Sequence, residues 1–399
     1  MLGWVTVLVI VILIGIAAFA GTLFYIQNQA SKVVLQYVPT ERNKNLLTAI
    51  TDDPYKPLWN LPRYKDKSGL HLKMRMTLKC DMTTVQVGKD VKICAAWYPK
   101  PPPKDKTKQE QKFKDKLIKK DVLLVLIPGF AGSQNSWGVA QAAQRAFDMY
   151  GWRTVVYNRP GYGAPNLANN GEERYYLHRF DLIEEFIRKV KTESGASKVV
   201  ILGQSLGGLH GYMATAQLQG LVDAAVVISP ILDPETNYKK VDEGDQGFKN
   251  WRLGVLKSEV ARWIKIAPEE WDKLGINMDL VNSIQSNQEF DHKVVCKTAR
   301  IPTLQEYYRK IGNIEMFAKI SCPFLMISSA SDQIVHLPPV EARLKDIVRN
   351  NKNVIWAHYG DGGHVEFPVI RSPEKGIECW ANIAGLKFLK LSLETAQST

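Results

Sequence analysis

Hydrophobic and polar positions alternate in blocks along most of the chain after Leu70. Short apolar runs, typical of strands buried on both faces, are separated by stretches with apolar residues every three or four positions, typical of helices. This alternation predicts an α/β fold with a mostly parallel sheet and helices on both faces. The expected strands are Val122–Ile127, Thr154–Tyr157, Lys198–Leu202, Ala224–Ile228, Phe324–Ser328 and Asn353–His358. The expected helices are Gly138–Tyr150, Tyr175–Val190, Leu206–Gln217, Pro339–Arg349 and Ile377–Leu391.

Two segments depart from this alternation. Before the first buried strand, strand-like residues at Leu72–Leu78 and Val91–Trp97 flank the turn Gly88-Lys89-Asp90, which predicts a hairpin. After Asp233 the chain runs to residue 318 without a clear buried strand. We therefore expect residues 233–318 to form a cap or lid inserted between two strands of the sheet.

The N-terminal residues indicate a membrane protein. Leu2 to Ile26 carry no charged side chain, and about 20 apolar residues suffice to span the hydrocarbon core as a helix. Trp4 and Tyr25 lie near the ends of this run, where amphipathic rings favour the membrane interface. We predict that residues 1–27 form an uncleaved single-pass transmembrane anchor, in the endoplasmic reticulum or another endomembrane.

A cleavable signal peptide is the alternative, because Ala18-Phe19-Ala20 forms an A-x-A cleavage site. Against cleavage, no basic residue precedes the apolar run, and the run continues past that site. Lys32, Arg42 and Lys44 follow the span, so the positive-inside tendency favours a cytosolic catalytic domain.

Composition and charge exclude several classes of protein. With 45% apolar residues, the chain is too hydrophobic to be disordered. Half of the net charge of +12 comes from residues 100–120, where nine lysines outnumber three acidic residues. This stretch predicts a solvated, flexible basic insertion, with attraction to anionic lipid as the alternative. Outside it, no basic face with interleaved aromatic residues indicates nucleic-acid binding. The five cysteines include no CxxC pair, and we expect no metal or organic cofactor.

The candidate chemistry begins at Gly203-Gln204-Ser205-Leu206-Gly207. This segment lies between a predicted strand and a predicted helix, which is the setting of a G-x-S-x-G nucleophile elbow. Gly203 and Gly207 would let the chain turn sharply, so that Ser205 presents its hydroxyl at the start of the helix. The alternative is an ordinary glycine-rich turn with a capping serine.

A serine hydroxyl needs a base to accept its proton. His364 is the best-placed histidine, because it follows the last predicted strand and the turn Asp361-Gly362-Gly363. Asp332 follows the preceding strand and would orient the imidazole, which gives the chain order Ser, Asp, His. Asp233, one strand earlier, is the alternative acid.

The predicted oxyanion hole has two backbone donors. One is the N–H of Leu206, directly after the serine, and the other is the N–H of Phe130 in the loop after Ile127. Gly129 stands where the backbone must approach the substrate closely. Removal of one such donor typically costs about 10²–10³ in rate.

These motifs resemble the AB hydrolase superfamily, and more narrowly the AB hydrolase 4 family of single-anchor membrane proteins. Besides the elbow, the resemblance rests on Val122–Gly132, Asn158–Gly163, Ile327–Asp332 and Asn353–His364 with Glu366-Phe367. It implies an α/β-hydrolase domain at residues 70–399, preceded by a linker and N-terminal extension at 28–69. It also implies the triad Ser205, Asp332 and His364, and activity on acylglycerols, phospholipids or other esters. One departure is Pro128, where the oxyanion motif usually has histidine.

The sequence therefore predicts a membrane-anchored serine hydrolase that cleaves acyl esters of lipids through an acyl-enzyme on Ser205. The expected partners are a lipid ester substrate and the bilayer; nucleic acid is not expected, and no protein partner is indicated. An acyltransferase on the same scaffold is one alternative, although no histidine here starts an H-x-x-x-x-D motif. A non-catalytic binding protein is the other, although all three triad positions are filled.

Overall fold

The computed structural model describes residues 33–52, 78–89, 91–100, 119–163, 178–365, 367–370 and 377–396. The predicted anchor at residues 1–27 and most of the basic insertion at 100–120 lie outside these ranges. Within them, no helix is both long enough and apolar enough to cross a membrane.

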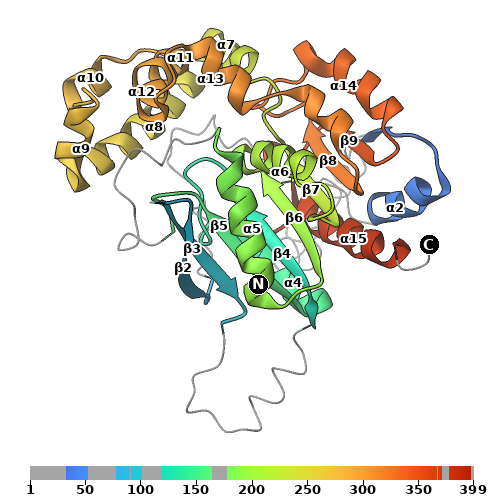
Figure 1. Ribbon diagram of the computed structural model, residues 1–399. Helices are drawn as coiled ribbons and strands as arrows, with labels where there is room; N and C mark the ends of the chain where they lie inside the picture. Colours follow the sequence, from blue (N-terminus) through green and yellow to red (C-terminus); the bar gives the residue numbers. More distant parts are fainter. Residues whose placement is uncertain are drawn as a thin grey trace, which may run out of the picture.

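A nine-stranded sheet forms the centre of the described structure (Figure 1). Its strands are β1 Val33–Gln36, β2 Asp81–Val87, β3 Val91–Tyr98, β4 Lys119–Ile127, β5 Trp152–Asn158, β6 Lys198–Gln204, β7 Ala224–Ile228, β8 Phe324–Ser329 and β9 Val354–Tyr359. Their spatial order is β1-β9-β8-β7-β6-β4-β5-β3-β2. Strands β4 to β9 are parallel, whereas β1, β3 and β2 pair antiparallel at the two edges. The predicted mostly parallel sheet is confirmed.

Helices cover both faces of this sheet (Figure 1). They are α2 Glu41–Thr51, α4 Trp137–Tyr150, α5 Phe180–Ser194, α6 Leu206–Gln217, α14 Pro338–Asn350 and α15 Trp380–Thr395. Strand β4 explains why the buried strands are continuously apolar. Val122, Leu124 and Leu126 belong to the cluster with α2, α4 and α15. Leu123, Val125 and Ile127 belong to the cluster with α5, α6 and α14, because successive side chains point to opposite faces.

Between β7 and β8 the chain leaves the sheet and forms a separate helical layer, above the sheet in Figure 1. Its elements are α7 Pro234–Glu243, α8 Gln246–Ile266, α9 Pro268–Lys273, α10 Met278–Ser283, α11 Asn287–Phe290, the π-helix η3 Asp291–Val295, α12 Cys296–Ala299, α13 Leu304–Ile311 and the 3-10 helix η4 Ile314–Lys319. We call residues 234–319 the cap. Tyr212 of α6 packs on Phe317 at a ring-centroid distance of 4.6 Å, and Tyr162 contacts Trp263 edge-on at 6.4 Å. The cap therefore shares an apolar core with one face of the sheet.

The predicted hairpin has a different first strand. Strand β2 runs from Asp81 to Val87 and pairs antiparallel with β3, with Val87 opposite Val91 across the predicted turn. Leu78 precedes this strand, and residues 72–77 lie outside the described ranges. Only Val85 and Val87 are buried apolar residues in β2, and Thr83 accepts a hydrogen bond from the Trp97 indole N–H at 3.0 Å. With two threonines, the strand is too polar to be recognised from hydrophobicity alone.

The described part of the stretch predicted as linker, residues 33–52 of 28–69, contains two regular elements. Strand β1 joins the edge of the sheet beside β9. The N-terminus of helix α2 is stabilised by Thr40, whose side chain accepts a hydrogen bond from the N–H of Asn43. The helix packs against α15. Its buried residues Leu46, Leu47 and Ile50 form a short apolar face. These residues belong to the folded unit.

Candidate active site

Ser205 lies at the sharp turn between β6 and α6. Its backbone has φ 57° and ψ −119°, a conformation that residues with a side chain rarely adopt. Such strain persists only where surrounding contacts enforce it, and it is frequent at functional sites. The turn places the serine at the carboxyl end of β6, where open α/β sheets bind their ligands.

Two glycines make this turn possible. A Cβ on Gly203 would clash with the carbonyl group of Gly207, and a Cβ on Gly207 would clash with the carbonyl oxygen of Ile127. The elbow therefore packs directly against the end of β4. The G-x-S-x-G spacing is a steric requirement here, which an ordinary capping turn would not impose.

The structure brings the three predicted side chains together. The His364 imidazole is hydrogen bonded through Nε2 to Ser205 Oγ at 2.7 Å and through Nδ1 to Asp332 Oδ2 at 2.8 Å. The side chain of Asp332 is 2% exposed and that of His364 is 13% exposed. In this geometry Nδ1 carries a proton toward the carboxylate and Nε2 can accept the serine proton.

Backbone donors fix the second oxygen of Asp332. Asp332 Oδ1 accepts N–H groups from Ile334 at 2.8 Å and from Val335 at 2.9 Å. Because these bonds occupy Oδ1, Oδ2 is free to hold the imidazole. The carboxylate is thus oriented before any substrate arrives.

Two serines that the sequence analysis missed hold the loop that carries His364. Ser229, fully buried after β7, donates its hydroxyl to the carbonyl oxygen of His364. Ser331 Oγ accepts the N–H of Gly363 at 3.2 Å. Both serines follow parallel strands at the same edge as Ser205, and this position was the available signal.

The loop predicted to carry the second oxyanion donor lies directly beside the nucleophile. A Cβ on Gly129 would lie 3.1 Å from the Ser205 Cβ, so glycine permits the close approach. Phe130 follows it, and Leu206 is the first residue of α6, where a backbone N–H has no partner inside the helix. The predicted donor Leu206 is thus adjacent to the serine in the chain, and the predicted donor Phe130 follows the glycine that approaches it.

Asp233, the alternative acid, and two further histidines have other roles. Asp233 caps α7, because its carboxylate accepts from the N–H and the hydroxyl of Thr236 at 3.1 and 2.6 Å. His358 is hydrogen bonded through Nδ1 to Ser328 Oγ at 2.8 Å, and burial lowers its pKa. His210 is buried in α6 against Phe180.

The cap interior also contains a buried carboxyl group. Asp291 is 8% exposed and accepts a hydrogen bond from the Tyr308 hydroxyl at 3.0 Å. Burial raises its pKa to about 7, against the opposing effects of the Arg252 charge and of that hydrogen bond. This group is separate from the hydrogen-bonded series at Ser205.

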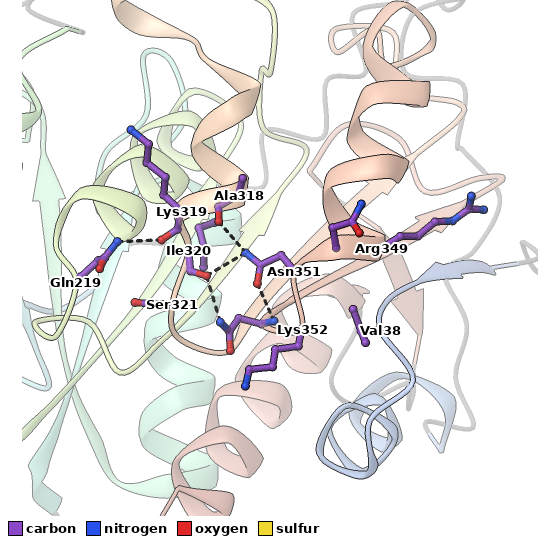
Figure 2. Close-up of a pocket in the computed structure, with 11 residues that line it drawn as sticks. Val38, Gln219, Ala318, Lys319, Ile320, Ser321, Arg349, Asn351 and Lys352 are labelled. Carbon is purple, nitrogen blue, oxygen red and sulfur yellow. Dashed lines mark hydrogen bonds between the residues drawn. The ribbon is translucent and has the colours of Figure 1, made fainter.

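A pocket lies at the opposite end of the sheet, before β8 and β9 (Figure 2). Lys319, Arg349 and Lys352 contribute to its lining. The Asn351 amide donates to the carbonyl oxygens of Phe317 and Ile320 at 2.9 and 3.0 Å, which ties the strand starts together. Ligands of parallel sheets bind at the carboxyl ends of the strands. This pocket lies at the other end, so we assign it no ligand and regard it as a gap between packed elements. No group of histidine, cysteine and acidic side chains suited to a metal ion occurs among the described residues.

Comparison with known proteins gives related sequences over much of the chain. Residues 122–263 match a family described as the alpha/beta hydrolase fold. The putative esterase YheT of Escherichia coli (strain K12) is 28% identical over 216 residues, which are 52% of this chain and 61% of that protein. An abhydrolase domain-containing protein of Dictyostelium discoideum is 25% identical over 274 residues, 68% of this chain and 67% of that one. The phospholipase ABHD3 of Mus musculus is 22% identical over 254 residues, 61% of this chain and 58% of that one. The matches thus cover only part of each relative, from 58% to 67% of its length.

Proposed function

Because the chain belongs to the α/β-hydrolase superfamily, we propose that it is a serine hydrolase that cleaves carboxylic acyl esters through an acyl-enzyme on Ser205. The observation that carries this proposal is the unbroken series of hydrogen bonds from Asp332 through His364 to Ser205. The strained backbone of Ser205 and the glycines around it support the same reading. The names of the E. coli and mouse relatives agree with ester hydrolysis.

In the proposed reaction, Ser205 Oγ attacks the ester carbonyl carbon while His364 Nε2 accepts the hydroxyl proton. Asp332 holds the imidazole and stabilises its protonated form. The N–H groups of Leu206 and Phe130 bind the oxyanion of the tetrahedral intermediate. His364 then gives its proton to the leaving alcohol, and the acyl group stays on Ser205. Water, deprotonated by His364, attacks the acyl-enzyme and releases the carboxylic acid.

The proposed substrates are acyl esters of lipids, either acylglycerols or phospholipids. The apolar side chains where the sheet meets the cap, among them Phe130, Tyr162 and Trp263, suit an acyl chain. The name of the mouse relative points in the same direction. The narrower assignment to the AB hydrolase 4 family stays a prediction from the sequence motifs.

Kinetics with matched variants test the proposed activity. Wild-type protein should hydrolyse p-nitrophenyl butyrate and at least one lipid ester, and Ser205→Ala should lower turnover by about 10⁴-fold or more. Ser258→Ala is the control, because this serine is exposed and its hydroxyl donates to the Gly254 carbonyl oxygen of its own helix. Near-normal turnover by Ser205→Ala would refute the proposal. Transfer of the acyl group to an added alcohol, without release of acid, would favour the acyltransferase alternative.

We also propose that residues 1–27 anchor the protein in a membrane with the catalytic domain in the cytosol. The support is the uncharged run from Leu2 to Ile26 and the basic residues after it. Full-length protein should stay in the membrane fraction after high-salt and alkaline washes, whereas attraction through the basic insertion alone would be salt-sensitive. A mature N-terminus at Gly21 in mass spectrometry would instead establish a cleaved signal peptide.

A further inference from the structure

Arg159 is a buried cation, and none of the described residues pairs with the tip of its side chain. It follows β5 directly and is 3% exposed. Its guanidinium carbon lies 4.6 Å from the ring centroid of Tyr162 and 5.5 Å from that of Phe130. Neither Nη1 nor Nη2 has a hydrogen-bond partner among the residues that the structure describes. Aromatic faces compensate a buried guanidinium only in part, so the described residues leave part of this charge uncompensated.

The position of Arg159 relates it to the candidate active site. Ser205 follows β6 and Arg159 follows β5, and these two strands flank β4 in the parallel part of the sheet (Figure 1). Because neighbouring strands lie about 4.8 Å apart, the two strand ends are separated by about 10 Å. The loop with Gly129 and Phe130 leaves the sheet between them. Arg159 therefore lies beside the proposed oxyanion loop, on the side away from Ser205.

Hydrogen bonds join the Arg159 turn to the oxyanion loop. Gln134 N–H donates to the Asn158 side-chain oxygen at 3.1 Å, and the Gln134 amide donates to the Gly163 carbonyl oxygen at 3.2 Å. A Cβ on Gly163 would collide with the Asn158 side chain at 2.8 Å, so this turn is tightly packed. The guanidinium is thus held at a fixed position relative to the oxyanion loop.

On the cap side, the charge of Arg159 acts on two tyrosine hydroxyls. Burial raises the pKa of Tyr238 to about 12, with the Arg252 and Arg159 charges opposing that rise. Burial also raises the pKa of Tyr307, again opposed by the Arg159 charge, so this charge is felt by tyrosines of both α7 and α13. The buried carboxyl group of the cap, Asp291, is influenced by Arg252, Tyr308 and Asp242 instead.

We propose that Arg159 binds the phosphate group of a phospholipid substrate while the ester carbonyl of the same molecule lies at Ser205. This assignment rests on the proposed ester hydrolase function. The two terminal nitrogens of a guanidinium match two phosphate oxygens in a bidentate, charge-assisted pair. The glycerol segment between phosphate and ester would then cross the oxyanion loop at Phe130. Arg159 determines specificity for a charged headgroup and takes no part in the bond-breaking steps.

A binding experiment tests this assignment without turnover. Full-length protein in neutral detergent is labelled at Ser205 with a fluorophosphonate, and ether-linked dihexyl glycerophosphocholine, dihexylglycerol or inorganic phosphate is added as protectant. Arg159→Gln should weaken protection by the ether phospholipid about 10- to 100-fold, the range expected for charge-assisted hydrogen bonds. Protection by dihexylglycerol should change far less. Equal weakening of both ether lipids would overturn the proposal, and equal protection by inorganic phosphate would overturn the headgroup assignment.

Turnover gives an independent readout. The ratio of kcat/KM for dihexanoyl phosphatidylcholine to that for dihexanoylglycerol should fall about 10- to 100-fold in Arg159→Gln. Arg159→Lys, which keeps the charge but loses the planar fork, should give an intermediate ratio. The control is Arg262→Gln, because Arg262 also stacks on an aromatic ring, at 4.3 Å from Trp263, but is exposed on α8. A ratio unchanged in Arg159→Gln would overturn the proposal.

Stability separates binding from a purely structural role. Because an unpaired buried charge destabilises a fold, Arg159→Gln should keep or raise the Tm of the ligand-free protein. A large fall in Tm would mean that the guanidinium holds the fold together, and would overturn the proposal. Failure of the wild-type protein to label would refute the ester hydrolase function and this inference with it. Normal labelling and hydrolysis with no effect of Arg159→Gln would refute only the inference.

Discussion

Charged groups are buried both at the carboxyl ends of the sheet strands and in the cap, but their charges are compensated in different ways. At the carboxyl ends of the strands, one oxygen of Asp332 accepts hydrogen bonds from two backbone N–H groups and the other is hydrogen bonded to His364. In the cap, Asp291 has the Tyr308 hydroxyl on one oxygen, and burial raises its pKa to about 7. Where the two regions meet, Arg159 has both terminal nitrogens unpaired within the described structure. The side chains that we propose to react are thus oriented by the chain itself, whereas at the boundary between sheet and cap the described residues leave the charge of Arg159 partly uncompensated.

The largest expected effect concerns Asp332, the carboxylate that is hydrogen bonded to His364. Asp332→Ala should lower turnover of p-nitrophenyl butyrate by about 10⁴-fold, because the imidazole loses its orientation and its charge partner. Asp233→Ala is the matched control, since its carboxylate caps α7 and should cost only about 1 kcal/mol of stability. If steady-state kinetics showed a larger loss of turnover in Asp233→Ala than in Asp332→Ala, the acid of the triad would be Asp233.

A second test concerns the steric demand of the elbow. In Gly207→Ala the added methyl group would overlap the carbonyl oxygens of Ile127 and Pro128, which are backbone atoms. We expect a loss of about 3 kcal/mol or more in the free energy of unfolding, measured in urea, together with loss of fluorophosphonate labelling. A stable, fully active Gly207→Ala would show that the turn is looser than its close contacts imply.

The buried carboxyl group of the cap should make stability depend on pH. The pKa of Asp291 rises from 3.8 to about 7 on folding, so the folded state binds the proton more tightly than the unfolded state. Its contribution is therefore fully present below pH ~4 and is lost as pH rises toward ~7, by a few kcal/mol at most. Asp291→Asn should remove this part of the pH dependence and be more stable than wild type at pH 8.

Thermal unfolding between pH 4 and pH 8 checks this expectation. Asp272→Asn, an exposed change on α9, serves as the control and should follow the wild-type profile. Parallel profiles for wild type and Asp291→Asn would mean that Asp291 titrates with an ordinary pKa.

The smallest expected effect uses a glycine of the cap to contrast with the elbow. Gly254 lies inside α8, and a Cβ there would meet no atom within 4 Å. Gly254→Ala should therefore stabilise the protein by about 0.5–1 kcal/mol, because alanine loses less backbone entropy in a helix. A destabilisation in urea unfolding would indicate a packing role that this position lacks in the structure.

The strands of the sheet and the elbow could be predicted because their signals are local. Buried parallel strands are apolar on both faces, and the elbow needs glycine at fixed spacing around Ser205. Strand β2 was missed because threonines occupy it, and β1 because an edge strand of four residues carries little pattern. The roles of Ser229 and Arg159 depend on contacts between segments far apart in the chain, which periodicity does not encode.

The most direct test of the account is to find which serine reacts. Full-length protein treated with a fluorophosphonate and digested should carry one adduct, on the peptide that contains Ser205. The adduct should be absent in Ser205→Ala, should form much more slowly in His364→Ala, and should form normally in Ser258→Ala. An adduct on another serine, or unchanged labelling of Ser205→Ala, would contradict the account.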